Sequence, residues 1–104
     1  KITAIFQPHL YTRTRDFAAE FAQSLSMLDE LILLDIYPAR ELPIEGVTSE
    51  IIFKDVAAGK KTLIKKEEVL DFLKEKELDI LITFGAGDID RLIVPIETML
   101  NGRL

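Results

Sequence analysis

Polar side chains suited to binding an anion gather directly after the first apolar run of the sequence, residues 2–6. His9, Tyr11, Arg13 and Arg15 follow that run closely. A guanidinium can hold a carboxylate or phosphate through two parallel hydrogen bonds, and an imidazole four residues earlier could donate to the same anion. On the residues alone, two interpretations are equally supported: an anion-binding site, or solvated arginines with a histidine that caps a turn. If there is a ligand, the spacing favours Arg13 over Arg15.

A second polar segment, residues 37–47, follows the second apolar run. It carries Tyr37, Arg40 and Glu41, together with two prolines. Loops of this length in small domains are often functional. On the residues alone, however, a proline-stiffened surface connection is the simpler interpretation.

Gly85, Ala86 and Gly87 follow the last apolar run. Two glycines allow a tight turn that brings the backbone close to a phosphate or to another domain. This is only part of a dinucleotide-binding fingerprint, and it comes at the end of the chain, so an interdomain contact is favoured over a nucleotide site. The sequence contains no phosphate-binding P-loop, and its single histidine has no cysteine or second histidine to share a metal.

Size and composition limit the classes of protein that fit. The chain has 104 residues, no cysteine and a net charge of −5. One domain without disulfides is expected, and an intracellular setting suits it. The acidic balance argues against general nucleic-acid binding, and no apolar run approaches the length of a membrane-spanning helix.

Apolar periodicity predicts alternating strands and helices. Strands are expected over residues 2–6, 31–36, 61–64 and 79–84, and helices over 14–25, 48–58, 67–76 and 90–101. Thr14 is the expected N-cap of the first helix. Alternation of this kind predicts an α/β fold, Rossmann-like and doubly wound, with a mainly parallel sheet and helices on both faces. The two polar loops and the glycine segment then share one edge of the sheet, where ligands of such folds bind.

Three segments, in the same order, carry a resemblance to a known family. They are the run from Phe6 to Asp16, the run from Asp35 to Ala39 with Glu41, and the run from Gly85 to Gly87. Through them the chain resembles the C-terminal domain of the Mur ligases, and among these the ligases that join L-alanine to UDP-N-acetylmuramate. A non-catalytic flavodoxin-like or receiver-like binding module is the alternative. A receiver would carry an acidic cluster after the first strand, where this chain has Gln7-Pro8-His9.

The resemblance implies a role in peptidoglycan synthesis in the cytoplasm. Residues 1–104 would be the substrate-closing C-terminal domain of a longer, three-domain enzyme, without the first helix of that domain. ATP and Mg²⁺ would serve the full-length enzyme, together with L-alanine and UDP-N-acetylmuramate. The fragment alone would be inactive, holding no catalytic residue, no metal and no tightly bound cofactor. Its partners would be the upstream N-terminal and central domains, with neither nucleic acid nor membrane.

The resemblance also implies roles for individual residues. Arg13 and His9 would bind the alanine carboxylate. Tyr11, Tyr37, Arg40 and Glu41 would form a loop on the substrate or nucleotide side, and Gly85, Ala86 and Gly87 an interdomain or phosphate-proximal loop. The chain departs from the family at two positions. Leu10 stands where the family commonly has a second arginine, and Arg40 where it usually has glycine.

Overall fold

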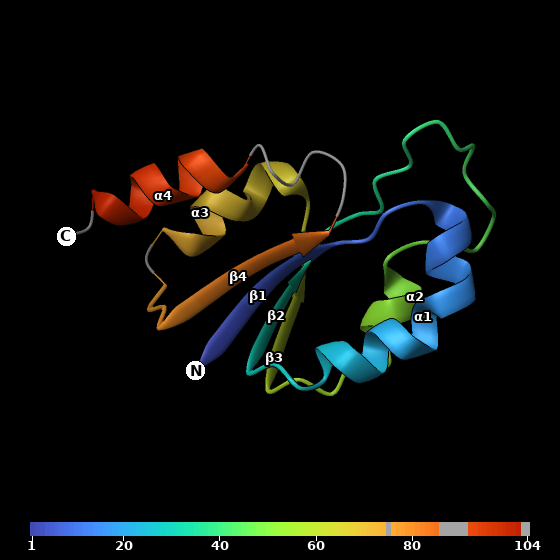
Figure 1. The fold of residues 1–104 in the computed structure, drawn as a ribbon, viewed down its shortest axis with the longest axis horizontal. Coiled ribbons are helices and arrows are strands. Elements are labelled where there is room, and N and C mark those ends of the chain that lie inside the picture. The colour runs from blue at the N-terminus through green and yellow to red at the C-terminus, as the bar shows by residue number, and fades with distance from the viewer. Residues whose placement is uncertain (75, 86–91, 103–104) are drawn as a thin grey trace.

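The computed structural model describes residues 1–74, 76–85 and 92–102 and shows one parallel sheet between two layers of helices (Figure 1). The sheet order is β3-β2-β1-β4. The strands are β1 (Ile2–Gln7), β2 (Glu30–Leu33), β3 (Lys60–Leu63) and β4 (Ile80–Gly85). The helices are α1 (Tyr11–Leu25), α2 (Glu50–Phe53), α3 (Val69–Leu73, after a 3₁₀ turn at Lys66–Glu68) and α4 (Ile93–Asn101). The predicted α/β class, with its parallel sheet, is confirmed.

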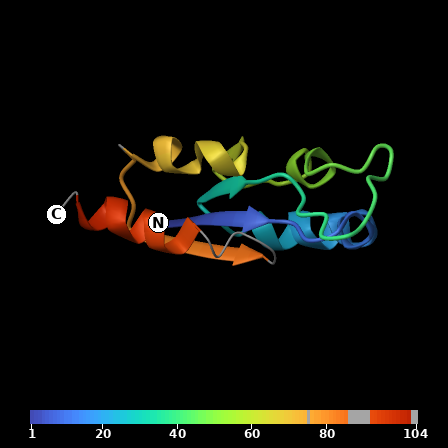
Figure 2. The same ribbon diagram turned by 90° about the horizontal axis from the view of Figure 1, so that it is seen from above.

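Helices cover both faces of the sheet. Figure 1 shows α3 and α4 on one side and α1 and α2 on the other, and Figure 2 shows α1 and α4 towards the β4 side of the sheet. The core beneath α1 and α2 consists of Phe6, Ala22, Leu25, Leu31, Leu33, Ile52 and Val56. The opposite core consists of Ile5, Ile32, Leu34, Val69, Leu73, Leu92 and Ile96. Because β1 and β2 are buried on both faces, they read as continuous apolar runs rather than as alternating ones.

The first helix begins earlier than predicted. It starts at Tyr11, and Leu10 rather than Thr14 occupies the N-cap position. The Thr14 side chain is fully buried, and its hydroxyl donates to the Leu10 carbonyl at 2.8 Å. Asp16 consequently lies beyond the first turn and pairs with Arg15 instead. Placing the helix start at Thr14 was therefore wrong, because a backbone carbonyl uses the hydroxyl expected to cap the helix.

The second strand and the second helix are both shorter than predicted. Pairing along β2 ends near Leu34, whose N–H donates to Phe6 O at 2.9 Å, because the partner strand reaches Pro8, which has no N–H to continue a ladder. The helix expected over 48–58 ends at Phe53. The Phe53 carbonyl accepts from Lys61 Nζ at 2.7 Å and the Ala57 N–H donates to Ser26 Oγ at 2.8 Å, so the bond that would extend the helix is not made.

Strand β4 exposes apolar side chains on the α1 face of the sheet. Ile80, Ile82 and Phe84 pair in register with inward residues of β1, yet they remain 51%, 42% and 37% exposed. Phe17 of α1 is 50% exposed. These four residues are called the β4 patch below.

In the part of the chain that the structure describes, no helix is long and apolar enough to cross a membrane.

A buried ion pair lies at the start of the inner strand β2. Glu30 is 1% exposed, and its Oε2 accepts from Lys76 Nζ at 2.8 Å. Its Oε1 has no hydrogen-bond partner among the described residues. Lys76 also lies over the Phe72 ring, with Nζ 5.0 Å from the centroid. The pair fixes the segment after α3 to the start of β2.

Removing Lys76 should be costly, because it leaves the Glu30 carboxylate buried and unpaired. We expect Lys76→Ala to lower the free energy of unfolding by about 3 kcal/mol in urea denaturation. The double variant Glu30→Met/Lys76→Met should recover most of that loss, since it removes both charges. A single variant within about 0.5 kcal/mol of wild type, the range of neutral surface changes, would contradict a structural role for the pair.

Candidate functional site

The loops after β1 and β2 are joined at the carboxyl edge of the sheet. The Leu10 N–H donates to Tyr37 O at 2.9 Å, and the Tyr37 N–H donates to Pro8 O at 2.8 Å. The His9 ring stacks on the Tyr37 ring, with centroids 5.9 Å apart and planes at 22°. The structure therefore brings together two residues that the sequence assigned to different segments. It also fixes the orientation of the only histidine.

Two residues in these loops have strained backbones. Leu10 has φ 69° and Ala39 has φ 54°, in the left-handed region that residues with a side chain rarely occupy. Such strain persists only where neighbouring contacts impose it, and it concentrates at functional sites. Here it marks both sides of the joint between the loops.

The side chain of Glu41 reaches the N-terminus of α1. Its Oε1 accepts from the Thr12 N–H at 3.1 Å, and its Oε2 accepts from Thr12 Oγ1 at 2.6 Å. The side-chain bond from Thr12, followed by the backbone bonds from Thr12 and Tyr11, holds the pKa of Glu41 below its ordinary value despite partial desolvation. The carboxylate is therefore ionised at neutral pH. The chain itself therefore fills the helix end, which would otherwise be open to an external anion.

Three arginines lie near this edge in different surroundings: two are on α1, Arg13 and Arg15, and one is in the loop after β2, Arg40. Arg15 is engaged by Asp16, with Nε 2.9 Å from Oδ1, a bond that raises the pKa of Arg15. Arg13 and Arg40 are exposed. The side chain of neither arginine makes a hydrogen bond or ion pair with residues 1–74, 76–85 or 92–102. Arg13 is thus the guanidinium on α1 that is open to a ligand.

Gly85 ends β4 beside the first loop. It pairs in register with Gln7, two residues before His9. Its φ is 131°, and a Cβ built on it would lie 2.3 Å from Gln7 O. The strand end therefore requires glycine. Ala86 and Gly87, predicted as part of the same loop, lie outside the described residues.

Two hollows flank the segment 35–38 at this edge. One, of about 210 Å³, is lined by Gln7, Asp35, Ile36, Tyr37, Pro38, Lys66 and Glu67. The other, of about 320 Å³, is lined by Tyr11, Asp35, Ile36, Pro38, Val47, Thr48 and Ser49. Gln7 is 5% exposed, and its Oε1 has no partner among the described residues. Gln7 was not among the residues predicted for the site, because a polar residue that ends a strand is usually solvated.

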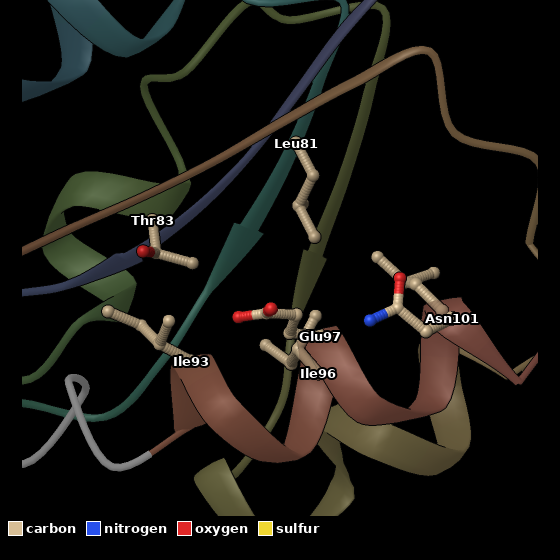
Figure 3. Close-up of a pocket in the computed structure, with 7 residues that line it drawn as sticks. Leu81, Thr83, Ile93, Ile96, Glu97 and Asn101 are labelled. Carbon is tan, nitrogen blue, oxygen red and sulfur yellow. The ribbon is translucent and has the colours of Figure 1, made fainter.

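A further groove of about 290 Å³ lies between β4 and α4. Figure 3 shows Ile93, Ile96 and Glu97 pointing from α4 towards the strand that carries Leu81 and Thr83. Its walls are mostly apolar. The described residues that line it include none of the predicted site residues. The polar edge of the sheet therefore remains the candidate site.

These features define a class of protein: a parallel α/β domain with polar loops at the carboxyl edge of its sheet and an accessible guanidinium beside a helix start. Such an edge can hold a small anion, but it contains no nucleophile–base pair among the described residues. No protein-family model matches the chain. Curated proteins, however, match it over nearly its whole length.

Three of these relatives bear the name UDP-N-acetylmuramate–L-alanine ligase. The protein from Parabacteroides distasonis is 62% identical over 100 residues, covering 96% of this chain and 22% of the relative. Those from Phocaeicola vulgatus and Porphyromonas gingivalis are 60% and 56% identical, again over 22% of their length. These matches extend over nearly the whole chain, which spans about a fifth of the length of the relatives it matches. The resemblance inferred from the sequence is confirmed.

Proposed function

We propose that this chain is the C-terminal domain of an ATP-dependent ligase that joins L-alanine to UDP-N-acetylmuramate in cytoplasmic peptidoglycan synthesis. The observation that carries the proposal is the 62% identity to a ligase of that name over 96% of the chain. The domain binds the amino acid and closes the active site. These 104 residues contain no P-loop, which supports the proposal that the rest of the enzyme binds ATP.

Arg13 and His9 bind the alanine carboxylate in this proposal. The guanidinium of Arg13 is exposed and has no partner among the described residues. The imidazole of His9 is held in place by its stacking on Tyr37. Holding the carboxylate through two parallel hydrogen bonds leaves the amino group free to attack an activated acyl group. Positioning of this kind is the chemical contribution of the domain.

The remaining loop residues complete the wall of the active site. Tyr11, Tyr37, Arg40 and Glu41 face the substrate or nucleotide side, and Gly85, Ala86 and Gly87 contact another domain or lie near a phosphate. Among the described residues no three acidic or imidazole side chains gather to hold a metal. The described residues therefore do not form a Mg²⁺ site.

The β4 patch supports the proposal that residues 1–104 are part of a larger domain. Phe17, Ile80, Ile82 and Phe84 are apolar side chains left partly exposed, the last three along the length of β1. A preceding helix of the same domain, packed on this face, would remove them from water. Such burial contributes about 25 cal/mol per Å² of apolar surface.

The proposed activity can be tested on the full-length protein. It should release one ADP for each molecule of UDP-N-acetylmuramoyl-L-alanine formed from ATP, L-alanine and UDP-N-acetylmuramate. Residues 1–104 alone should release no ADP under the same conditions, since the chain has no P-loop. A full-length protein that forms product with another amino acid but not with alanine would contradict the substrate assignment. ADP release by residues 1–104 would contradict the division of labour between the domains.

A further inference from the structure

Glu41 supplies the cap that α1 does not find in its own sequence. The N-cap residue is Leu10, and no side-chain cap bond is made at that position. The first amides of a helix are normally left for a cap, water or a ligand. Here the Glu41 carboxylate takes the Thr12 N–H and hydroxyl, at 3.1 and 2.6 Å. An anion drawn to the helix end would meet a carboxylate already there.

The same contact fixes the relation between the two polar loops. The loops are tied at Leu10 and Pro8 to Tyr37, and the Glu41 bonds add a second attachment four residues further on. Ala39, with its left-handed backbone, turns the chain between these attachments. Because the turn is attached at both ends, its conformation and its position against α1 are held together. If the Glu41 attachment is lost, the turn is free to relax and move away from α1.

We propose that Glu41 is a positioning residue for amino-acid binding. It fixes the loop after β2 against α1, and it fills the helix end so that an incoming carboxylate is received by the Arg13 guanidinium rather than by the helix amides. Arg13 lies one residue after Thr12, the residue that Glu41 holds. This inference rests on the proposed function, because the carboxylate it concerns is that of the amino-acid substrate.

Steady-state kinetics of the full-length ligase can test the role of Glu41. We expect Glu41→Ala to raise KM for L-alanine about tenfold while kcat and KM for ATP stay within about twofold, because a misplaced binding group weakens one substrate. Glu41→Gln keeps an oxygen that can accept from the Thr12 N–H, and its amide nitrogen can donate to Thr12 Oγ1, so its KM should stay within about threefold of wild type. A purely structural residue would lower stability and affect all three parameters together.

Two further variants serve as matched controls. Glu45→Ala removes an exposed carboxylate from the same loop and should leave KM for L-alanine unchanged. Thr12→Val removes the hydroxyl donor. The double variant with Glu41→Ala should raise KM for L-alanine little more than either change alone, since both changes remove the same interaction.

The outcomes separate this inference from the proposed function. Should Glu41→Ala leave KM for L-alanine unchanged, or lower it, Glu41 is not a positioning residue; a lower value would show that it competes with the substrate. If Arg13→Ala raises that KM while Glu41→Ala does not, only the role of Glu41 is overturned. If neither variant changes it, the proposed carboxylate site itself is wrong.

Discussion

Replacing Arg13 with alanine in the full-length ligase is expected to raise KM for L-alanine about a hundredfold, with KM for ATP nearly unchanged. A hydrogen bond to a charged group contributes about 1.5–3 kcal/mol, which corresponds to a factor of roughly 10 to 150. The exposed Arg13 side chain has no partner among the described residues, so its loss leaves no buried charge behind. The effect should therefore appear in substrate binding rather than in stability.

Two variants make this prediction specific to the guanidinium. Arg13→Lys keeps the charge but not the two parallel donors, and should fall between wild type and Arg13→Ala. Arg15→Ala is the matched control, because Arg15 is on the same helix but is already paired with Asp16. An unchanged KM for L-alanine in Arg13→Ala, or an equal rise in Arg15→Ala, would contradict the assignment. Initial rates at saturating ATP and UDP-N-acetylmuramate measure the effect.

The sequence could predict the fold because its apolar runs are long and regular. Strands β1 and β2 are buried on both faces and therefore stand out as continuous apolar segments. The boundaries were less accurate where a residue distant in sequence decides them. Helix α2 ends early because Lys61 and Ser26 take its next hydrogen-bonding groups. Local propensity contains no information about such contacts.

The candidate site was predictable in composition but not in its internal contacts. Parallel strands bring their carboxyl ends to one edge, so the nearness of the loop with His9 and the loop with Tyr37 followed from topology. The stacking of their rings depends on the bridge between the loops, which no local pattern encodes. The capping of α1 by Glu41, from 29 residues away, was likewise invisible. The helical spacing of Phe17 matches that of the buried residues of α1, yet its side chain is 50% exposed.

Gly85→Ala is expected to destabilise the domain by about 4 kcal/mol, at the upper end of single substitutions. Two effects add together. A φ of 131° is strained for any residue with a Cβ, and the new Cβ would lie 2.3 Å from Gln7 O in the backbone of β1. Gln7 and Gly85 are paired in the ladder, so the clash is relieved only by separating the strand ends. That separation would also shift Pro8 and His9 at the site.

Gly46 offers a control that isolates the backbone strain. Its φ is 80°, but a Cβ there would meet nothing within 4 Å. Gly46→Ala should therefore cost only about 1 kcal/mol, the strain of a left-handed alanine. Urea denaturation of both variants in the full-length enzyme compares their free energies of unfolding. KM for L-alanine, measured at low temperature, shows whether the site is changed. Equal losses of stability would show that strain alone accounts for Gly85, and that β1 does not pack against it as closely as the structure indicates. A larger loss for Gly85→Ala, together with a raised KM for L-alanine, would tie the end of β4 to the placement of His9.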